Sequence, residues 1–243
     1  MKEIKQFYSL NFDTIKRKKK DIKYLVFHYT GMKSEKSAIK RLIDIKSKVS
    51  CHYFIKKNGS IVNMVPDMYV SWHAGISFWK NFKGINKYSI GIEIQNFGHQ
   101  YGYEYFNKRQ IYSIKYLSLK LAKKYNLKNK HFLGHSDIAT ERKKDPGEKF
   151  PWELLSKYNI GMWHSVNKKL LKKYRFEKLS KLEKKLFLSK LKKIGYFFKK
   201  KKINSIFFVV KAFQRRFRPQ LINGKIELEC LEIAKNLVKS GFN

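Results

Sequence analysis

The pattern of apolar residues changes character near residues 160–175. Before this stretch, short apolar runs typical of strands alternate with apolar residues at helical spacing, and after it the spacing is helical only. A length of 243 residues suits one large or two modest domains. We therefore expect a unit of strands and helices over residues 21–165, a small helical unit over residues 175–243, and a basic lead-in over residues 1–20.

In the first unit, apolar runs bounded by turn-forming residues predict strands. These runs lie at residues 22–29, 52–57, 60–65, 88–95 and 131–135. The Asn58-Gly59 pair separates the second run from the third and predicts a hairpin with a type I′ turn. Helical periodicity predicts helices over residues 34–45 and 107–125, whereas residues 71–87 show little periodicity and predict a long loop that walls a binding cleft.

Three short helices are predicted for the second unit, because its apolar residues recur at intervals of three and four. The first helix is expected to stop at Gly195 and the second at Pro219. The positions expected to be buried are, helix by helix, Leu179, Leu182, Leu186, Leu191 and Ile194; Ile206, Val210, Phe213 and Phe217; and Leu231, Ala234 and Val238.

The net charge of +37 would suit a partner such as nucleic acid, but the distribution of the charge does not support one. Lysines are spread along the whole chain and no nucleic-acid-binding motif is present, so we expect no nucleic-acid partner. The basic runs at residues 17–20 and 199–202 are expected to be solvated. Cys51 and Cys230 form no CxxC pair, and each is expected to be a small buried residue.

Membrane insertion and export are not indicated by the apolar runs. The longest of them fall far short of the roughly 20 residues that a transmembrane helix requires. Residues 1–20 lack the continuous apolar core of a signal peptide, so the chain as written is expected to stay in the cytoplasm. We also expect it to be a monomer.

Two histidines and an aspartate carry the chemistry that we consider first. His28 lies at the C-terminal end of the first predicted strand, His135 ends the last one, and Asp145 precedes a Pro-Gly pair. Two imidazoles and one carboxylate would make a three-ligand zinc set with a fourth position open to water. Glu93 and Lys143 are the residue types needed to move a proton and to stabilise an oxyanion.

Each of these residues also has an ordinary explanation. A histidine at a strand end is more often structural, and Asp145 can form the turn at Pro146 through its side chain. Glu93 can be an exposed strand residue, and Lys143 is one lysine among many. His131 and His135 have the i, i+4 spacing of a helical zinc pair, but no HExxH motif is present and the segment reads as a strand end.

The local contexts of these residues resemble those of a known family. The matching segments are FHYT (27–30), SCHY (50–53), WHAGIS (72–77), SIGIE (89–93), HSDIA (135–139), RKKDPG (142–147) and FPW (150–152). In combination they resemble the zinc-dependent N-acetylmuramoyl-L-alanine amidases of the phage T7 lysozyme and peptidoglycan-recognition-protein type, and most of all the AmiD-like branch. The resemblance covers about residues 22–165.

This resemblance implies an α/β fold with a central mixed β-sheet flanked by helices. It implies that His28, His135 and Asp145 bind one zinc ion, that Glu93 is the acidic catalytic residue, and that Lys143 is the catalytic lysine. The implied reaction is hydrolysis of the amide between N-acetylmuramic acid and L-alanine in peptidoglycan or its muropeptide fragments. A peptidoglycan-recognition protein without catalysis is the alternative.

Four further residues are candidates for the cleft or for contact with the substrate. Tyr29 and Trp72 are plausible walls of the cleft, as is Trp79, although aromatic side chains more often pack in the core. His73 can touch substrate or water, or it can support a metal ligand from behind.

The helical unit resembles a three-helix peptidoglycan-binding domain in which lysines replace most of the acidic and small residues. It either binds glycan or only packs on the catalytic unit. Two cellular compartments are also alternatives. The resemblance points to the periplasm or outer membrane, whereas the missing signal peptide points to the cytoplasm. Intact sacculus and anhydro-muropeptides are the corresponding substrates.

Overall fold

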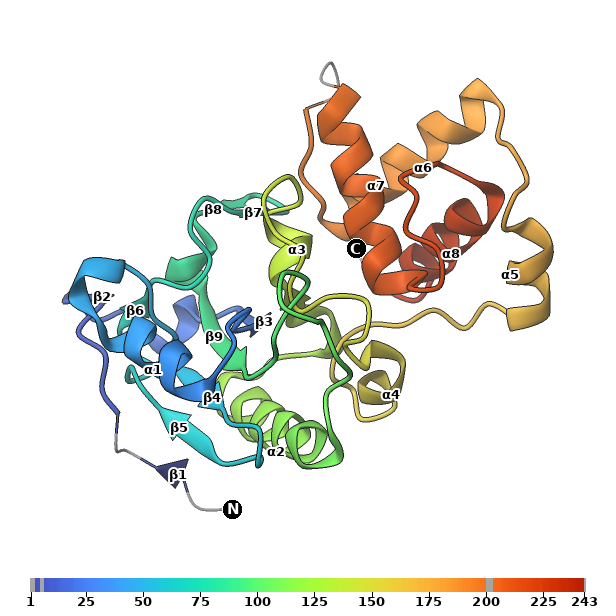
Figure 1. Cartoon of the computed structure of the whole chain (residues 1–243). Helices are drawn as coiled ribbons and strands as arrows, with labels where there is room; N and C mark the ends of the chain where they lie inside the picture. The colour runs from blue at the N-terminus through green and yellow to red at the C-terminus, as the bar shows by residue number, and fades with distance from the viewer. Residues whose placement is uncertain (1–2, 5–6, 200–202, 243) are drawn as a thin grey trace.

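A mixed β-sheet forms the centre of the first unit in the computed structural model, which describes residues 3–4, 7–199 and 203–242 (Figure 1). From edge to edge its strands are β1 (Glu3–Ile4), β5 (Ile61–Asn63), β4 (Tyr53–Ile55), β9 (Ser89–Ile94), β3 (Tyr24–Tyr29) and β10 (Phe132–Gly134). Only the β4–β5 pairing is antiparallel among these described strands. The α/β fold with a central mixed sheet is therefore confirmed.

The remaining elements surround this sheet. Two small antiparallel pairs join β2 (Phe12–Asp13) to β6 (Val70–Ser71) and β7 (Phe78–Trp79) to β8 (Phe82–Lys83). The α-helices are α1 (Glu35–Ile43), α2 (Lys108–Tyr125), α3 (His135–Ile138), α4 (Trp152–Ser156), α5 (Lys168–Tyr174), α6 (Lys181–Ile194), α7 (Ile203–Phe217) and α8 (Leu228–Lys239). Short 3-10 turns lie at Lys19–Asp21, Ile45–Ser47, Ile85–Tyr88 and Asn129–His131.

The alternation of side chains along β3 divides the molecule into layers. Leu25 and Phe27 point to one face of the sheet, where they share a buried cluster with residues of α2. Tyr24 and Val26 point to the opposite face and share a cluster with the helices of the second unit. On that same side of the sheet α1 packs against Phe54 of β4. His28 follows the same alternation and therefore belongs to the face that α1 and the second unit cover.

Capping residues set the ends of two of the predicted helices. The Ser34 hydroxyl accepts the Ser37 N–H and begins α1. Asn107 and Gln110 form a reciprocal capping box at the start of α2, and Asn126 ends this helix in the left-handed conformation.

The hairpin between β4 and β5 is present, but its predicted type I′ turn is wrong. A type I′ turn needs positive φ at both central residues, and of the Asn58-Gly59 pair only Gly59 has it, at 86°. The Gly59 N–H donates to the Lys56 carbonyl at 3.0 Å, so the turn begins at Lys56, one residue earlier than expected. Gly59 then occupies the bulge position that follows a type I turn.

Two other segments are more ordered than the sequence suggested. Residues 71–87 contain the β7–β8 pair and a 3-10 turn rather than one long loop. In the N-terminal lead-in, β1 pairs with β5 and β2 pairs with β6. Arg17 is buried and donates to the carbonyls of Asp67 and Ser89, so it is not part of a solvated run. Within the run at 199–202, residues 200–202 lie outside the described residues.

In the helical unit most of the predicted positions are buried, although Ile206 and Val238 are only partly so and two positions of α6 are exposed. Phe213 and Phe217 of α7 and Leu231 and Ala234 of α8 are fully buried or nearly so. On α6 the buried face is Phe187, Leu191 and Ile194, whereas Leu182 is 76% exposed and Leu186 is 39% exposed. The predicted face of α6 is therefore confirmed at Leu191 and Ile194 and wrong at Leu182 and Leu186, because its many leucines fit more than one stripe.

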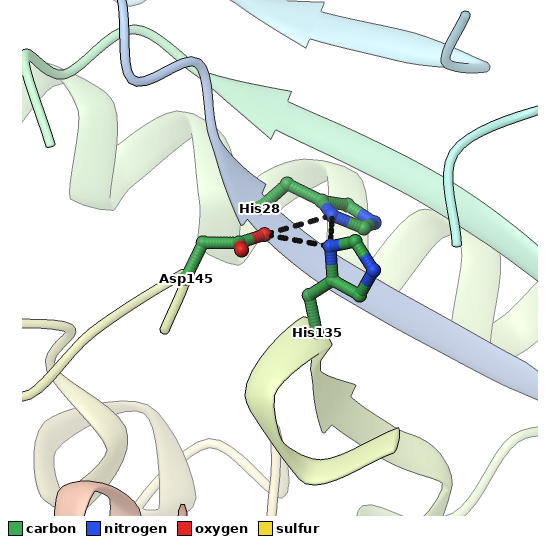
Figure 2. Close-up of side chains that lie close together, drawn as sticks. All are labelled: His28, His135 and Asp145. Carbon is green, nitrogen blue, oxygen red and sulfur yellow. Dashed lines mark hydrogen bonds and ion pairs between the residues drawn. The ribbon is translucent and has the colours of Figure 1, made fainter. Parts of the chain in front are cut away.

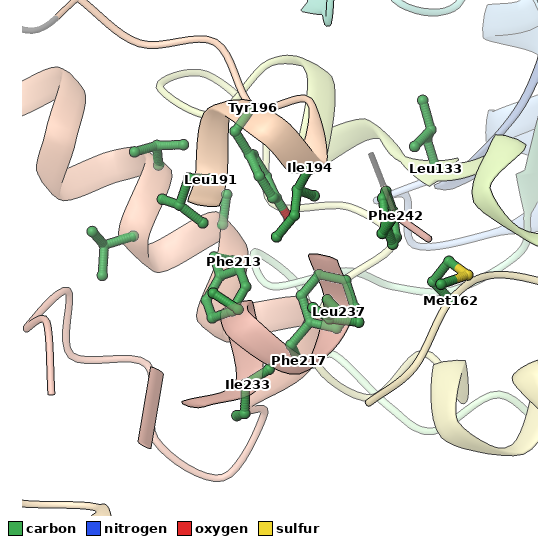
Figure 3. Close-up of a cluster of buried hydrophobic side chains, with 14 of the residues drawn as sticks. Leu133, Met162, Leu191, Ile194, Tyr196, Phe213, Phe217, Ile233, Leu237 and Phe242 are labelled. Carbon is green, nitrogen blue, oxygen red and sulfur yellow. The ribbon is translucent and has the colours of Figure 1, made fainter. Parts of the chain in front are cut away.

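One apolar cluster runs through both units (Figure 3). Leu133 of β10 belongs to it together with Phe213, Phe217 and Phe242 of the C-terminal region. Trp79 is fully buried in this cluster, with its ring 5.1 Å from that of Tyr196, so its expected role as a cleft wall is wrong. The Lys80 N–H also donates to the Gly195 carbonyl at 2.8 Å. The two units therefore share a core and a backbone contact.

Among the described residues, no helix combines the length and the apolar character needed to cross a bilayer.

Replacing Trp79 by Ala should lower the free energy of unfolding by about 3–5 kcal/mol, because a large cavity opens in the shared cluster. Leu182→Ala is the matched control and should change it by less than about 0.5 kcal/mol, since that side chain is exposed. Urea unfolding followed by circular dichroism measures both. Equal effects of the two substitutions would contradict the assignment of Trp79 to the core.

Candidate metal centre

Three donor atoms meet at the carboxyl-terminal edge of the sheet (Figure 2). His28 lies near the end of β3, and His135 directly follows the neighbouring parallel strand β10, so both side chains reach the same edge. The loop after α3 returns Asp145 to them. The His28 Nδ1 and His135 Nδ1 atoms are 2.9 Å apart, and the Asp145 Oδ2 atom lies 3.0 Å from the first and 2.9 Å from the second.

The outer hydrogen bonds of the two imidazoles decide which nitrogen is free. His135 Nε2 lies 3.0 Å from the Ala74 carbonyl, which can only accept, so this nitrogen carries the hydrogen. In the neutral ring, Nδ1 of His135 then carries no hydrogen and has a free lone pair. This lone pair points at His28 and Asp145.

A chain of hydrogen bonds fixes His28 in the same way. The Ser89 hydroxyl donates to the Ile85 carbonyl and must therefore accept from His73 Nε2, 3.1 Å away. Burial, followed by the charges of nearby histidines, holds the pKa of His73 well below its usual range, so the ring is neutral and its Nδ1 accepts from His28 Nε2 at 3.0 Å. His28 Nδ1 is left without a hydrogen, like Nδ1 of His135.

The charge states of the cluster fit a cation. Burial, and then the charge of His135, lowers the pKa of His28 to about 4. Burial opposes ionisation of Asp145, but the charges and hydrogen bonds that His135 and His28 offer in their protonated forms outweigh it and hold the pKa of Asp145 well below its usual range; between neutral rings a bound cation would take that place. Two lone pairs and a carboxylate thus face one another at 2.9–3.0 Å, near the separation of about 3.3 Å expected between ligands of a tetrahedral zinc ion.

Glu93 lies beside this cluster on the adjacent strand. It is the register partner of His28 in the parallel β3–β9 pair. Its Oε2 atom is buried and has no hydrogen-bond partner among the described residues. Burial, and then the charge of Asp145, raises the pKa of Glu93 well above its usual value, while Lys143 lowers it. Glu93 is therefore a carboxyl group whose proton affinity is raised and whose oxygen is free to act.

A cleft of about 650 Å³ is lined by His135, Asp145 and Glu93. The other predicted functional residues that line it are Tyr29, Trp72, His73 and Lys143. Lys143 is half-buried whereas Lys144, which also lines the cleft, is exposed.

The sequence-based interpretation missed several residues of the cleft wall, and it assigned no special role to one of them, His99. Its Nδ1 atom lies 2.9 Å from the Tyr29 hydroxyl, its Nε2 atom lies 3.0 Å from Glu148, and its ring stacks on Tyr103. The bond to His99 occupies the hydroxyl of Tyr29, and the Trp72 indole N–H is likewise occupied, by Asp13. A single histidine in an irregular loop gave no signal that would have found this contact.

Comparison with known proteins decides the family. The sequence profile described as N-acetylmuramoyl-L-alanine amidase matches residues 18–148, more than half of the chain. The chain belongs to the N-acetylmuramoyl-L-alanine amidase family.

The relatives of this amidase extend over both units. It is 34% identical over 231 residues to N-acetylmuramoyl-L-alanine amidase AmiD of Escherichia coli, covering 90% of this chain and 83% of that protein. The structure of E. coli AmiD with anhydro-N-acetylmuramic acid-L-Ala-D-gamma-Glu-L-Lys matches with a TM-score of 0.81 at 32% identity, covering 91% of this chain and 90% of that one. AMPDH3 of Pseudomonas aeruginosa with anhydromuramic pentapeptide matches with a TM-score of 0.79 at 27% identity, covering 94% and 95%.

Replacing Ser89 by Ala should destabilise this amidase by about 1–3 kcal/mol, because the buried His73 N–H loses its acceptor. It should also weaken metal binding, since the orientation of His28 depends on His73. Ser118→Ala is the matched control: Ser118 is equally buried, but its hydroxyl has no partner among the described residues, so no loss is expected. Urea unfolding and metal titration measure both effects. Two variants that behave alike would contradict the hydrogen-bond chain.

Proposed function

We propose that this family member uses zinc, held by His28, His135 and Asp145, to hydrolyse the amide between N-acetylmuramic acid and L-alanine. The observation that carries the proposal is the convergence of two bare imidazole nitrogens and a carboxylate beside a cleft. That cleft is lined by His135, Asp145 and Glu93, and the Oε2 atom of Glu93 has no hydrogen-bond partner among the described residues. Nitrogen and oxygen donors of this kind are the ligands of catalytic zinc sites with an open position.

A bound zinc ion would supply Lewis acidity that makes attack by water on the amide carbonyl possible near neutral pH. The residues of the chain supply the rest. Glu93 Oε2 accepts the proton of the attacking water and delivers it to the departing amide nitrogen, a task suited to a carboxyl group with a raised pKa. The ammonium group of Lys143 stabilises the negative charge that develops on the carbonyl oxygen.

The cleft also fits the proposed substrate class. The ligands in the AmiD and AMPDH3 structures are anhydromuramyl peptides, and the first contains glutamate, which carries a free carboxylate. Arg41, Arg142 and Lys144 line the cleft of this chain and offer cations to such peptides. Tyr29 and Trp72 offer ring faces to the sugar, while His73 is engaged behind His28. We therefore propose anhydro-muropeptides as substrates, with residues 21–165 as the catalytic unit of a monomeric enzyme.

Replacing Asp145 by Asn should weaken zinc binding by more than the roughly 10–100-fold that is typical of changes around a ligand shell, because the only charged ligand of the set is lost. Chelation of the wild-type enzyme should abolish hydrolysis of muropeptides, and added Zn²⁺ should restore it. Competition with a chromophoric chelator measures the affinity. Unchanged affinity in the variant would remove Asp145 from the ligand set, and activity in excess chelator would exclude the metal mechanism.

Glu93→Gln should retain zinc and lower kcat by roughly 10²–10⁴-fold, because the amide side chain cannot carry the proton. The control is Glu153→Gln, since Glu153 forms an exposed ion pair with Lys168 away from the cleft. Zinc content and release of the stem peptide are measured on the same preparations. Normal turnover by Glu93→Gln would show that another group transfers the proton, and no turnover by the wild type would favour a recognition protein without catalysis.

A further inference from the structure

We propose that Arg216 and Tyr196 of the helical unit are positioning residues for the metal centre. They hold Asp137, and Asp137 holds the short helix that presents His135. The proposal rests on the zinc site described above. It gives the C-terminal unit a role in the active site that does not depend on binding glycan.

Asp137 is the connection between the two units. One of its carboxylate oxygens, Oδ2, accepts the Gly134 N–H at 2.8 Å and so caps the first turn of α3. His135 is the first residue of that turn. The other oxygen, Oδ1, accepts the Tyr196 hydroxyl at 2.7 Å, and Oδ2 also receives Nη1 of Arg216 at 2.5 Å. Residues of the helical unit thus hold the side chain that shapes the backbone at His135.

Arg216 also bonds to the backbone on the N-terminal side of His135. Its Nη2 atom donates to the carbonyl of Phe132, on strand β10, at 3.0 Å. The guanidinium group lies 4.0 Å from the centre of the Trp152 ring, which fixes its plane. Arg216 therefore bonds to the strand before His135 and to the helix after it. The side chains of Arg216 and Asp137 are 2% and 1% exposed, so water does not weaken the pair.

The need for such support follows from the length of α3. A helix of four residues, His135–Ile138, is too short to be stable without tertiary contacts. The same turn fixes a second ligand, because the Ser136 N–H donates to the Asp145 carbonyl at 2.7 Å. A shift of α3 would therefore move both His135 and Asp145. Metal affinity depends on how well the surroundings fix the ligands in advance.

The chain contains a close control for Arg216. Arg218 is two residues further along and 1% exposed, and it is also paired with acidic groups, Glu227 and Glu229. These partners lie within the helical unit. Arg216→Gln and Arg218→Gln should both lose stability, but only the first removes a contact with α3.

The test measures zinc affinity by chelator competition, the absorption spectrum of the Co²⁺-substituted protein, and urea unfolding for the wild type and both variants. Arg216→Gln should weaken zinc binding about 10–100-fold and change the Co²⁺ spectrum, as expected for loss of support around a ligand. Arg218→Gln should bind zinc like the wild type. Wild-type affinity and spectrum in Arg216→Gln would overturn the proposal, and so would equal weakening in both variants.

If Arg216→Gln does not fold, a second pair of variants with smaller changes tests the proposal. Tyr196→Phe removes one hydroxyl group from Asp137, and Arg175→Gln removes one partner of Glu229 within the helical unit. Tyr196→Phe should weaken zinc binding and Arg175→Gln should not; equal affinities would overturn the proposal. Failure of the wild-type protein to bind zinc would instead overturn the proposed function, so the two failures are distinguishable.

Discussion

The structure depends on one constraint. Two imidazole nitrogens and one carboxylate oxygen face one another, and no hydrogen lies between them. His28 and His135 each use one ring nitrogen for an outer hydrogen bond, so their inner nitrogens meet the Asp145 carboxylate as acceptors. Such an arrangement is repulsive unless a cation joins it. The register of β3 and β9 places Glu93 beside His28. The unpaired oxygen of Glu93 therefore lies where a water molecule attacking an amide would need a base.

The surroundings of these atoms extend into both halves of the chain. From the first unit, Ser89 and His73 fix the ring of His28. From the second, Arg216 and Tyr196 fix the turn that carries His135. The apolar cluster that runs through both units excludes water from these bonds, which strengthens them. The helical unit is thus part of the structure around the metal centre, whatever its affinity for glycan.

The N-terminal segment is joined to the same region. Arg17 is buried and donates to the carbonyl of Ser89, the residue at the end of the hydrogen-bond chain behind His28. Asp13 occupies the indole N–H of Trp72, which lines the cleft. A run of basic residues in the sequence therefore contains one that is structural. The charge count does not reveal it, because burial depends on residues 50–72 positions away.

Local periodicity was enough to predict the strands β3 and β9 and the helix α2, because such a pattern acts over a few neighbouring residues. The face of α6 was predicted only in part: Leu191 and Ile194 are buried as expected, but Leu182 and Leu186 are exposed and the buried Phe187 was not predicted. Trp79 was misplaced for a related reason. An aromatic residue in an irregular segment can serve a cleft or a core, and only packing against Tyr196 decides between them.

By itself the sequence determined the types of residue available for catalysis and the ends of strands at which they stand. His28, Glu93, His135, Lys143 and Asp145 could be selected because their neighbours match a family pattern. Only the tertiary structure decided which ring nitrogen is free, which carboxyl group lacks a partner, and that Arg216 bonds to residues on both sides of His135, which lies 81 positions before it in the chain. The reason is physical: protonation and orientation depend on burial and on hydrogen bonds between distant segments, and no local pattern encodes these.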